Sequence, residues 1–228
     1  MRATEGMRQI VPPAVIGLMN IWLAGTAVSA DCPPTCMRFS WSGEFCTTAA
    51  SLDTAAATGG ECFDRLVVQL NEGLLATYSW ANFGSCSNTI EAQDRFTVFG
   101  LTEGTPIALY AELALRLEVS GGGYLEGSLQ FDDASIAVWQ KLICCSPEPW
   151  AEADTLLRVP VVAQAGYPFT IRYTVYVSAG GESFSGANAQ LSFGELPPRV
   201  SIVSCHGYTQ EGTQTRTTTW GRLKAVFR

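Results

Sequence analysis

Apolar side chains recur at every second position over a long stretch of this sequence. Between Pro106 and Val119 the apolar residues on one phase are Ile107, Leu109, Ala111, Leu113, Leu115, Leu117 and Val119. Glu112, Arg116 and Glu118 fall on the opposite phase. The Ala, Leu, Glu and Arg content of the stretch favours a helix by propensity, but a helix would spread those charges around its whole circumference. The spacing of two therefore predicts a strand with one buried and one solvated face.

The same alternation returns in three later stretches, residues 125–131, 169–177 and 189–193. Turn-forming residues interrupt these runs, and we expect chain turns at Thr102–Gly104, Gly121–Gly123, Asp132–Asp133, Gly180–Gly181 and Pro197–Pro198. Strands that each bury one face are typical of two stacked sheets. The sequence thus predicts an all-β, antiparallel β-sandwich of about eight to ten strands. We expect this domain to span residues 65–208.

The N-terminus has the features of a secretory signal peptide. Arg2 and Arg8 precede an apolar run from Ile10 to Ala27, and Val28-Ser29-Ala30 offers small residues for cleavage. A retained membrane anchor is the alternative, but prolines and an asparagine interrupt the run, which leaves fewer than the ~20 continuous apolar residues that a span needs. We expect residues 1–30 to be removed, no membrane span to remain, and the protein to be secreted.

Eight cysteines follow the predicted cleavage site: Cys32, Cys36, Cys46, Cys62, Cys86, Cys144, Cys145 and Cys205. An even number of cysteines in an exported chain indicates disulfide bonds, here up to four. A metal site is disfavoured because no Cys-x-x-Cys pair is present. The adjacent Cys144 and Cys145 are expected to bond two different partners. Residues 31–64 hold half of the cysteines and are predicted to form a loop-rich, cross-linked segment packed on the sandwich.

Charge separates the chain into an acidic body and a basic end. The full sequence has 14 basic and 21 acidic residues, a formal charge of -7, which argues against a nucleic-acid ligand. Residues 209–228 are basic instead, with Arg216, Arg222, Lys224 and Arg228 against the single acidic residue Glu211. This tail is expected either to dock or sort the protein or to lie back on its own acidic body.

Aromatic residues supply the candidate binding site. A β-sandwich that presents tryptophan or tyrosine rings on one sheet can stack them on sugar rings, and Tyr176, Trp139 and Trp150 are the candidates for contacting a glycan. Tyr176 lies on the polar phase of its strand, which predicts that its ring faces outward. The alternative is ordinary packing in or around the core.

The sequence offers little support for catalysis. The single histidine, His206, has Ser201 and Ser204 near it but no motif that would supply an orienting acid and an oxyanion hole. Carboxylates that could serve a hydrolase are few, namely Asp132, Asp133, Glu126 and Asp154. We therefore expect no enzymatic activity, no cofactor and no metal.

Two segments resemble exported bacterial proteins of the PEP-CTERM type. They are residues 94–107 followed by Leu125-Glu-Gly-Ser-Leu, and residues 184–204 with their Leu-Pro-Pro turn between two strands. The resemblance implies an exported β-sandwich associated with surface or exopolysaccharide material, and it does not extend to the C-terminal anchor of those proteins. We expect a non-enzymatic structural or interaction protein of the cell envelope or extracellular matrix, partnered by polysaccharide or an envelope protein. The alternative is a carbohydrate-binding module.

Overall fold

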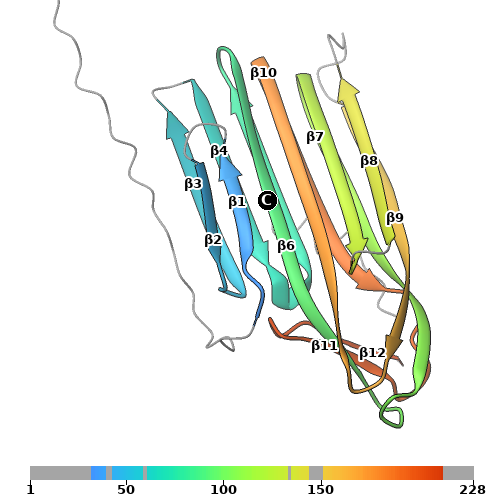
Figure 1. Cartoon of the computed structure of the whole chain (residues 1–228). Coiled ribbons are helices and arrows are strands. Elements are labelled where there is room, and N and C mark those ends of the chain that lie inside the picture. Colours follow the sequence, from blue (N-terminus) through green and yellow to red (C-terminus); the bar gives the residue numbers. More distant parts are fainter. Residues whose placement is uncertain (1–31, 40–42, 59–60, 133–134, 144–150, 213–228) are drawn as a thin grey trace, which may run out of the picture.

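The computed structural model describes residues 32–39, 43–58, 61–132, 135–143 and 151–212, most of them in β-strands (Figure 1). The strands are β1 (Thr35–Phe39), β2 (Gly43–Thr47), β3 (Ser51–Thr58), β4 (Cys62–Gln69), β5 (Leu74–Ala81), β6 (Ser85–Phe99), β7 (Pro106–Phe131), β8 (Ser135–Ile143), β9 (Ala151–Gln164), β10 (Pro168–Phe193), β11 (Ser201–Ser204) and β12 (Thr209–Glu211), with one turn of 3-10 helix, η1 (Leu70–Glu72). Neighbouring strands are antiparallel throughout. This confirms the predicted all-β antiparallel class.

All twelve strands belong to one sheet that folds over on itself into two leaves. The first leaf has the order β2, β1, β6, β10, β7, β8, with β11 and β12 continuing from the far end of β6. The second leaf has the order β3, β4, β5, β10, β7, β9. Strands β7 and β10 are each 26 residues long and serve both leaves. Figure 1 shows β1, β6, β10, β7 and β8 side by side along the molecule.

A corner in β7 and β10 turns one leaf back over the other. The β10 ladder with β7 shifts register between Gly180 and Phe184, and Gly121 of β7 has a φ of 83°. The two arms of β10, before and after the corner, are joined by a hydrogen bond that Ser185 Oγ donates to Ser178 O at 2.8 Å. The predicted chain turns at Gly121–Gly123 and Gly180–Gly181 are therefore wrong. These glycines bend strands that continue, as glycines in a strand interior often do.

One hydrophobic core fills the space between the leaves. The alternating apolar residues of 106–119 all face inward and are buried, as are those of 169–177, which confirms both predictions. The ring of Phe96 in the first leaf packs edge-on against Phe193 of the second at 5.0 Å between centroids. Leu115 lies directly beneath Gly127, where an added Cβ would overlap the leucine side chain. Residues twelve positions apart in β7 thus face each other across the core.

Three disulfides join six of the cysteines. Cys36–Cys46 links directly opposed residues of β1 and β2, and Cys62–Cys86 links β4 of the second leaf to β6 of the first. Cys32–Cys205 forms because β1 and β11 share one edge of β6. The N-terminal end of β1 and the C-terminal end of β11 then meet beside Arg95, whose carbonyl accepts the Cys205 amide at 2.9 Å.

Cys144 and Cys145 lie outside the described residues. Their expected bonding to two different partners stays a prediction. The sequence could not reveal the three described pairings, because spacing along the chain does not show which strands share an edge. The three disulfides indicate that the chain matures in an oxidising compartment.

Residues 32–58 are built into both leaves. β1 and β2 extend the first leaf and β3 forms the edge of the second, which differs from the loop-rich segment predicted for 31–64. Met37, Phe39 and Leu52 are buried in the common core. Over the described part of the chain, no helix is long and apolar enough to cross a membrane. The predicted signal peptide and most of the basic tail lie outside the described residues.

Replacing Gly121 by alanine is expected to lower the free energy of unfolding by about 2 to 3 kcal/mol. The left-handed backbone at Gly121 strains any side chain, and a Cβ there would lie 2.8 Å from the Ser183 Cβ. Gly181→Ala is the matched control at the same corner, because its φ is 53° but no atom lies within 4 Å of its Cβ position. Urea unfolding should show about 1 kcal/mol for that control. Equal losses in the two variants would contradict the steric contact with Ser183.

Candidate functional site

The usual arrangement of polar and apolar side chains is reversed near the corner of the second leaf. On β4 the carboxylate of Asp64 points into the core, fully buried, while the neighbouring Phe63 faces solvent. On β5 Ser79 is buried and Trp80 is exposed in the same way. Burying apolar surface is the main driving force for folding, so stability alone does not account for this arrangement.

Three rings form a row across adjacent strands on the outer face of this leaf. Phe63 stands opposite Trp80, and Trp80 stands opposite Phe184 of β10. The exposed fractions are 44% for Phe63 and 52% for Trp80, whereas Phe184 is half-buried. Tyr78, two positions before Trp80 on the same face of β5, completes the set. We call Phe63, Trp80, Phe184 and Tyr78 the aromatic row.

The position of Tyr78 depends on a glycine. Its ring stacks on that of Phe184, with 6.0 Å between centroids and 25° between planes. Gly186 lies beneath both rings, and a Cβ there would come within 2.9 Å of Tyr78 and 3.0 Å of Phe184. The Tyr78 hydroxyl donates to Asn188 Oδ1 at 3.0 Å. Burial raises the pKa of Tyr78, so this hydroxyl stays protonated at neutral pH.

A hydrogen-bonded polar cluster supports the row from inside. Asp64 Oδ1 accepts Ser79 Oγ at 2.6 Å and Asn88 Nδ2 at 3.1 Å, and the same Asn88 nitrogen donates to Tyr78 O at 2.8 Å. Thr77 Oγ1 is hydrogen-bonded to Asn88 Oδ1. Asn88 belongs to β6, so the cluster ties the two leaves together beneath the row. The Cys62–Cys86 disulfide cross-links the same two leaves at this end.

One charge pair lies directly beside the aromatic row. Arg65, which stands opposite Tyr78, donates to Asp53 through Nε at 3.1 Å and Nη2 at 2.7 Å. The hydrogen bonds that Arg65 donates to Asp53 raise the pKa of Arg65, so its guanidinium stays charged. A guanidinium and a carboxylate joined by two hydrogen bonds neutralise each other's charge. The row therefore combines exposed rings with one neutralised charge pair.

Such a surface can bind a flat ligand with one apolar face. Aromatic rings contribute large contact area at low entropic cost because they have few rotatable bonds. The sequence interpretation missed all four residues of the row. A usable signal was present, since the alternation of β4 and β5 places aromatic residues on one phase and Asp64 and Ser79 on the other.

The predicted glycan-contacting residues are placed apart. Tyr176 lies on the outer face of the first leaf, as predicted, with its ring 5.7 Å from that of Tyr124. Trp139 stands opposite Gly127 on β8 and packs against the core, so its assignment as a glycan contact is not supported. Gly127 is itself buried on the inner face, above Leu115, so its strand partner Trp139 lies on the inward phase of β8. Trp150 lies outside the described residues.

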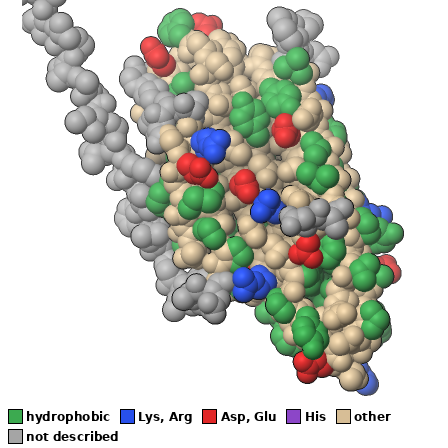
Figure 2. All heavy atoms as spheres, viewed as in Figure 1, with side chains coloured by type: hydrophobic (Ala, Val, Ile, Leu, Met, Phe, Trp, Pro, Cys, Tyr) green, Lys and Arg blue, Asp and Glu red, His purple; other side chains and the backbone are tan. Residues whose placement is uncertain are grey.

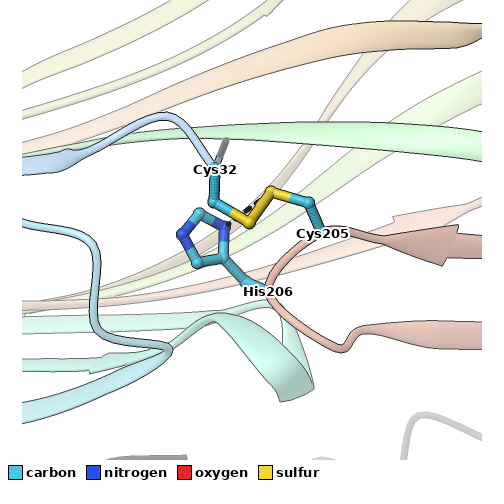
Figure 3. Close-up of side chains that lie close together, drawn as sticks. All are labelled: Cys32, Cys205 and His206. Atoms are coloured by element: carbon cyan, nitrogen blue, oxygen red, sulfur yellow. Dashed lines mark hydrogen bonds between the residues drawn. A yellow bond between two sulfur atoms is a disulfide. The ribbon is translucent and has the colours of Figure 1, made fainter. Parts of the chain in front are cut away.

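His206 is buried beside the Cys32–Cys205 disulfide (Figure 3). Its Nδ1 lies 2.9 Å from Asp94 Oδ1 and 3.8 Å from Cys205 Sγ. Ser204 Oγ accepts the backbone amides of His206 and Tyr208 at 3.2 and 3.1 Å, so it supports the β11–β12 turn. Cys32, Cys205 and His206 offer ligand atoms within 4.8 Å of one another, but both sulfurs are in the disulfide.

The candidate carboxylates do not share a site. Glu126 lies on the outer face of the first leaf and Asp154 on that of the second. Asp132 follows the last residue of β7, and its Oδ1 accepts the Thr170 amide at 3.0 Å. Asp133 lies outside the described residues. Among the described candidates, no two face each other across a cleft as a glycoside hydrolase requires.

No family model matches the chain, and no curated protein matches it. Among solved structures, it is similar to TmCBM61 in complex with β-1,4-galactotriose, with 12% identity, 53% of this chain and 70% of that chain covered, and a TM-score of 0.31. A carbohydrate-binding module described as promiscuous, from the β-sandwich superfamily, gives 6% identity, 78% and 92% coverage and a TM-score of 0.25. A structure of infectious bursal disease virus is 9% identical, with 92% of this chain and 70% of that chain covered and a TM-score of 0.19. TM-scores this low support no inference about this chain.

Proposed function

We propose that the protein is an exported, non-enzymatic interaction protein whose aromatic row binds a neutral polysaccharide. Export is supported by the signal-like N-terminus and by three disulfides. Binding is supported by the row of Phe63, Trp80 and Phe184 on one open sheet face. The ligand would lie across the strands, with the apolar faces of its sugar rings on the aromatic rings.

The reversal of pattern at the corner carries this proposal. A chain that buries Asp64 and exposes Trp80 on neighbouring strands gives up hydrophobic stabilisation, since a large side chain contributes about 1.5 to 3 kcal/mol when it is fully buried. Departures of this kind from the folding rules are concentrated at functional sites. The hydrogen-bonded cluster beneath the rings then holds the strands that present them.

The spacing and charge of the row favour a glycan over a protein partner. Adjacent strands lie about 4.8 Å apart, close to the length of one sugar residue in an extended chain, so successive rings can meet successive sugars. The next outward residue of β4, Arg65, is paired with Asp53, and the next outward residue of β10 after Phe184 is Gly186, which has no side chain. The apolar strip is therefore narrow, whereas a stable protein interface buries about 800 Å² on each partner.

Replacing Trp80 by threonine is expected to weaken polysaccharide binding about 30-fold, equal to about 2 kcal/mol for a central contact tryptophan. Threonine suits an exposed strand position, so the fold should be retained. The oxidised protein without its predicted signal peptide would be tested against immobilised cellulose, chitin, galactan and xylan. Alginate would serve as an anionic comparison, which the charge-paired surface should not prefer.

Tyr167→Thr is the matched control because Tyr167 is a similarly exposed ring, 50%, in the turn between β9 and β10. Its affinity should equal that of the unaltered protein. Loss of binding in both variants, or equal binding in Trp80→Thr and the unaltered protein, would overturn the assignment of the row. If the unaltered protein binds none of the neutral polysaccharides, the proposal itself fails and the row becomes a candidate protein interface.

A further inference from the structure

We infer that the protein carries a second glycan-binding surface on the opposite face and bridges two polysaccharide chains. This inference rests on the proposed function of the aromatic row. The second surface lies on the outer face of the first leaf and consists of Tyr124, Tyr176, Glu126, Gln140 and Arg172. We call it the tyrosine surface. Its occupant is a second chain of the same neutral polysaccharide.

Two tyrosine rings form the apolar part of the tyrosine surface. Tyr176 of β10 stands opposite Glu126 of β7, and Tyr124 stands opposite Ser178, so the two rings lie on adjacent strands. Their centroids are 5.7 Å apart and their planes are tilted by 60°. Leu142 of β8, opposite Tyr124, is 72% exposed and extends the apolar area to the edge of the leaf. Figure 2 shows hydrophobic side chains gathered over the upper parts of β10 and β7 on this face.

Hydrogen-bonding groups surround the two rings. The Tyr124 hydroxyl donates to Glu126 Oε2 at 2.7 Å, and Gln140 Nε2 donates to the same oxygen at 3.0 Å. The hydrogen bond to Glu126 raises the pKa of Tyr124 to about 12, which keeps the phenol protonated. Carboxylate, amide and hydroxyl groups beside a ring match the alternating hydroxyls and apolar faces of a sugar.

The charge on this face favours a neutral ligand. Arg172 Nε lies 3.4 Å from Glu91 Oε1, and Arg38 Nη2 lies 3.2 Å from Glu44 Oε2. Figure 2 shows acidic and basic side chains interspersed on this face and no area of one sign. An anionic polymer or a strongly charged protein needs a field of one sign, which paired charges do not supply. A neutral polysaccharide therefore fits the tyrosine surface as it fits the aromatic row.

The two surfaces point away from each other because of the corner in β10. Tyr176 lies before the register shift and Phe184 lies at its end, on arms of the strand that face each other through Ser178 and Ser185. Both rings are on the outer phase of their arms, so the core lies between them. A single extended glycan cannot lie on both faces at once. Two occupied surfaces therefore mean two chains held by one protein.

The test uses beads coated with whichever neutral polysaccharide binds best among cellulose, chitin, galactan and xylan. The unaltered, oxidised protein should clump the beads and bind two soluble oligosaccharides of that glycan per molecule. Tyr176→Thr and Trp80→Thr should each bind one oligosaccharide and fail to clump the beads. Each should also bind the coated surface about 30-fold more weakly, because only one of the two surfaces then holds the glycan. Urea unfolding of each variant checks that the fold is retained, and Gln140→Ala provides a second, milder change at the tyrosine surface.

The outcomes separate the two proposals. One bound oligosaccharide in the unaltered protein, abolished by Trp80→Thr and unaffected by Tyr176→Thr, would overturn the second surface and leave the proposed function standing. Clumping that persists in Tyr176→Thr and in Gln140→Ala would also overturn it, because bridging would then come from another source such as self-association. Absence of any glycan binding by the unaltered protein would overturn both proposals.

Discussion

Replacing both Cys32 and Cys205 by serine is expected to lower the free energy of unfolding by about 4 to 5 kcal/mol. This disulfide joins residues separated by 173 positions, so it closes the longest loop among the three described disulfides. The unfolded chain gains the most freedom when that loop is opened. The bond also holds the first described residue against the turn between β11 and β12, next to the buried His206.

The control is the double replacement of Cys36 and Cys46 by serine. Their disulfide closes a loop of only 10 positions. The chain-entropy model predicts a loss about 2.5 kcal/mol smaller than for Cys32 and Cys205. Urea unfolding of both double variants under the same conditions measures the difference. Equal losses would show that native-state contacts, and not loop closure, dominate the contribution of these bonds.

Asp94→Ala is the second change with a large expected effect, a loss of about 3 to 5 kcal/mol. Asp94 and His206 are both buried, with exposed side-chain fractions of 1% and 0%. Asp94 Oδ1 lies within hydrogen-bonding distance of His206 Nδ1 and accepts the Arg95 amide at 2.8 Å. Removing the carboxylate leaves the imidazole in the core without this partner, and an unpaired buried polar group costs more than the hydrogen bond contributes.

A double-mutant cycle tests whether the pair is energetically coupled. The variant that carries both Asp94→Ala and His206→Ala should lose at least about 1 kcal/mol less stability than the sum of the two single variants. The reason is that no polar partner is then left unpaired. Strict additivity in urea unfolding would mean that Asp94 stabilises the protein through the Arg95 amide alone, independently of His206.

Strand location was predictable because one face of each strand is buried. The inward residues of 106–119 had to be apolar to fill the core, and the outward ones were free to carry Glu112, Arg116 and Glu118. That period identified the strands and the fold class. It could not reveal that the two runs on either side of Gly121 are one strand, because a glycine permits either a chain reversal or a bend.

The binding surfaces were harder to predict for a related reason. Tyr176 was found because it interrupts a regular polar phase, but Trp139 stands opposite Gly127 and packs against the core. The phase of an edge strand such as β8 is ambiguous when its outward residues, Ile136, Val138 and Leu142, are themselves apolar. For the aromatic row, the informative residue was Asp64, a carboxylate on the inward phase that marks where the pattern is reversed.

The shared strands determine how the molecule would bear a mechanical load. Tyr176 and Phe184 both belong to β10 and are separated by eight positions, so tension between ligands on the two faces would run along that short length of one backbone. Peptide bonds would carry that force, whereas in a sandwich of two separate sheets it falls on side-chain packing. Such a load would act on the corner where β7 and β10 pass from one leaf to the other. Under load, a matrix cross-linked by such a protein would lose the contacts between sugars and aromatic rings before the protein itself unfolded.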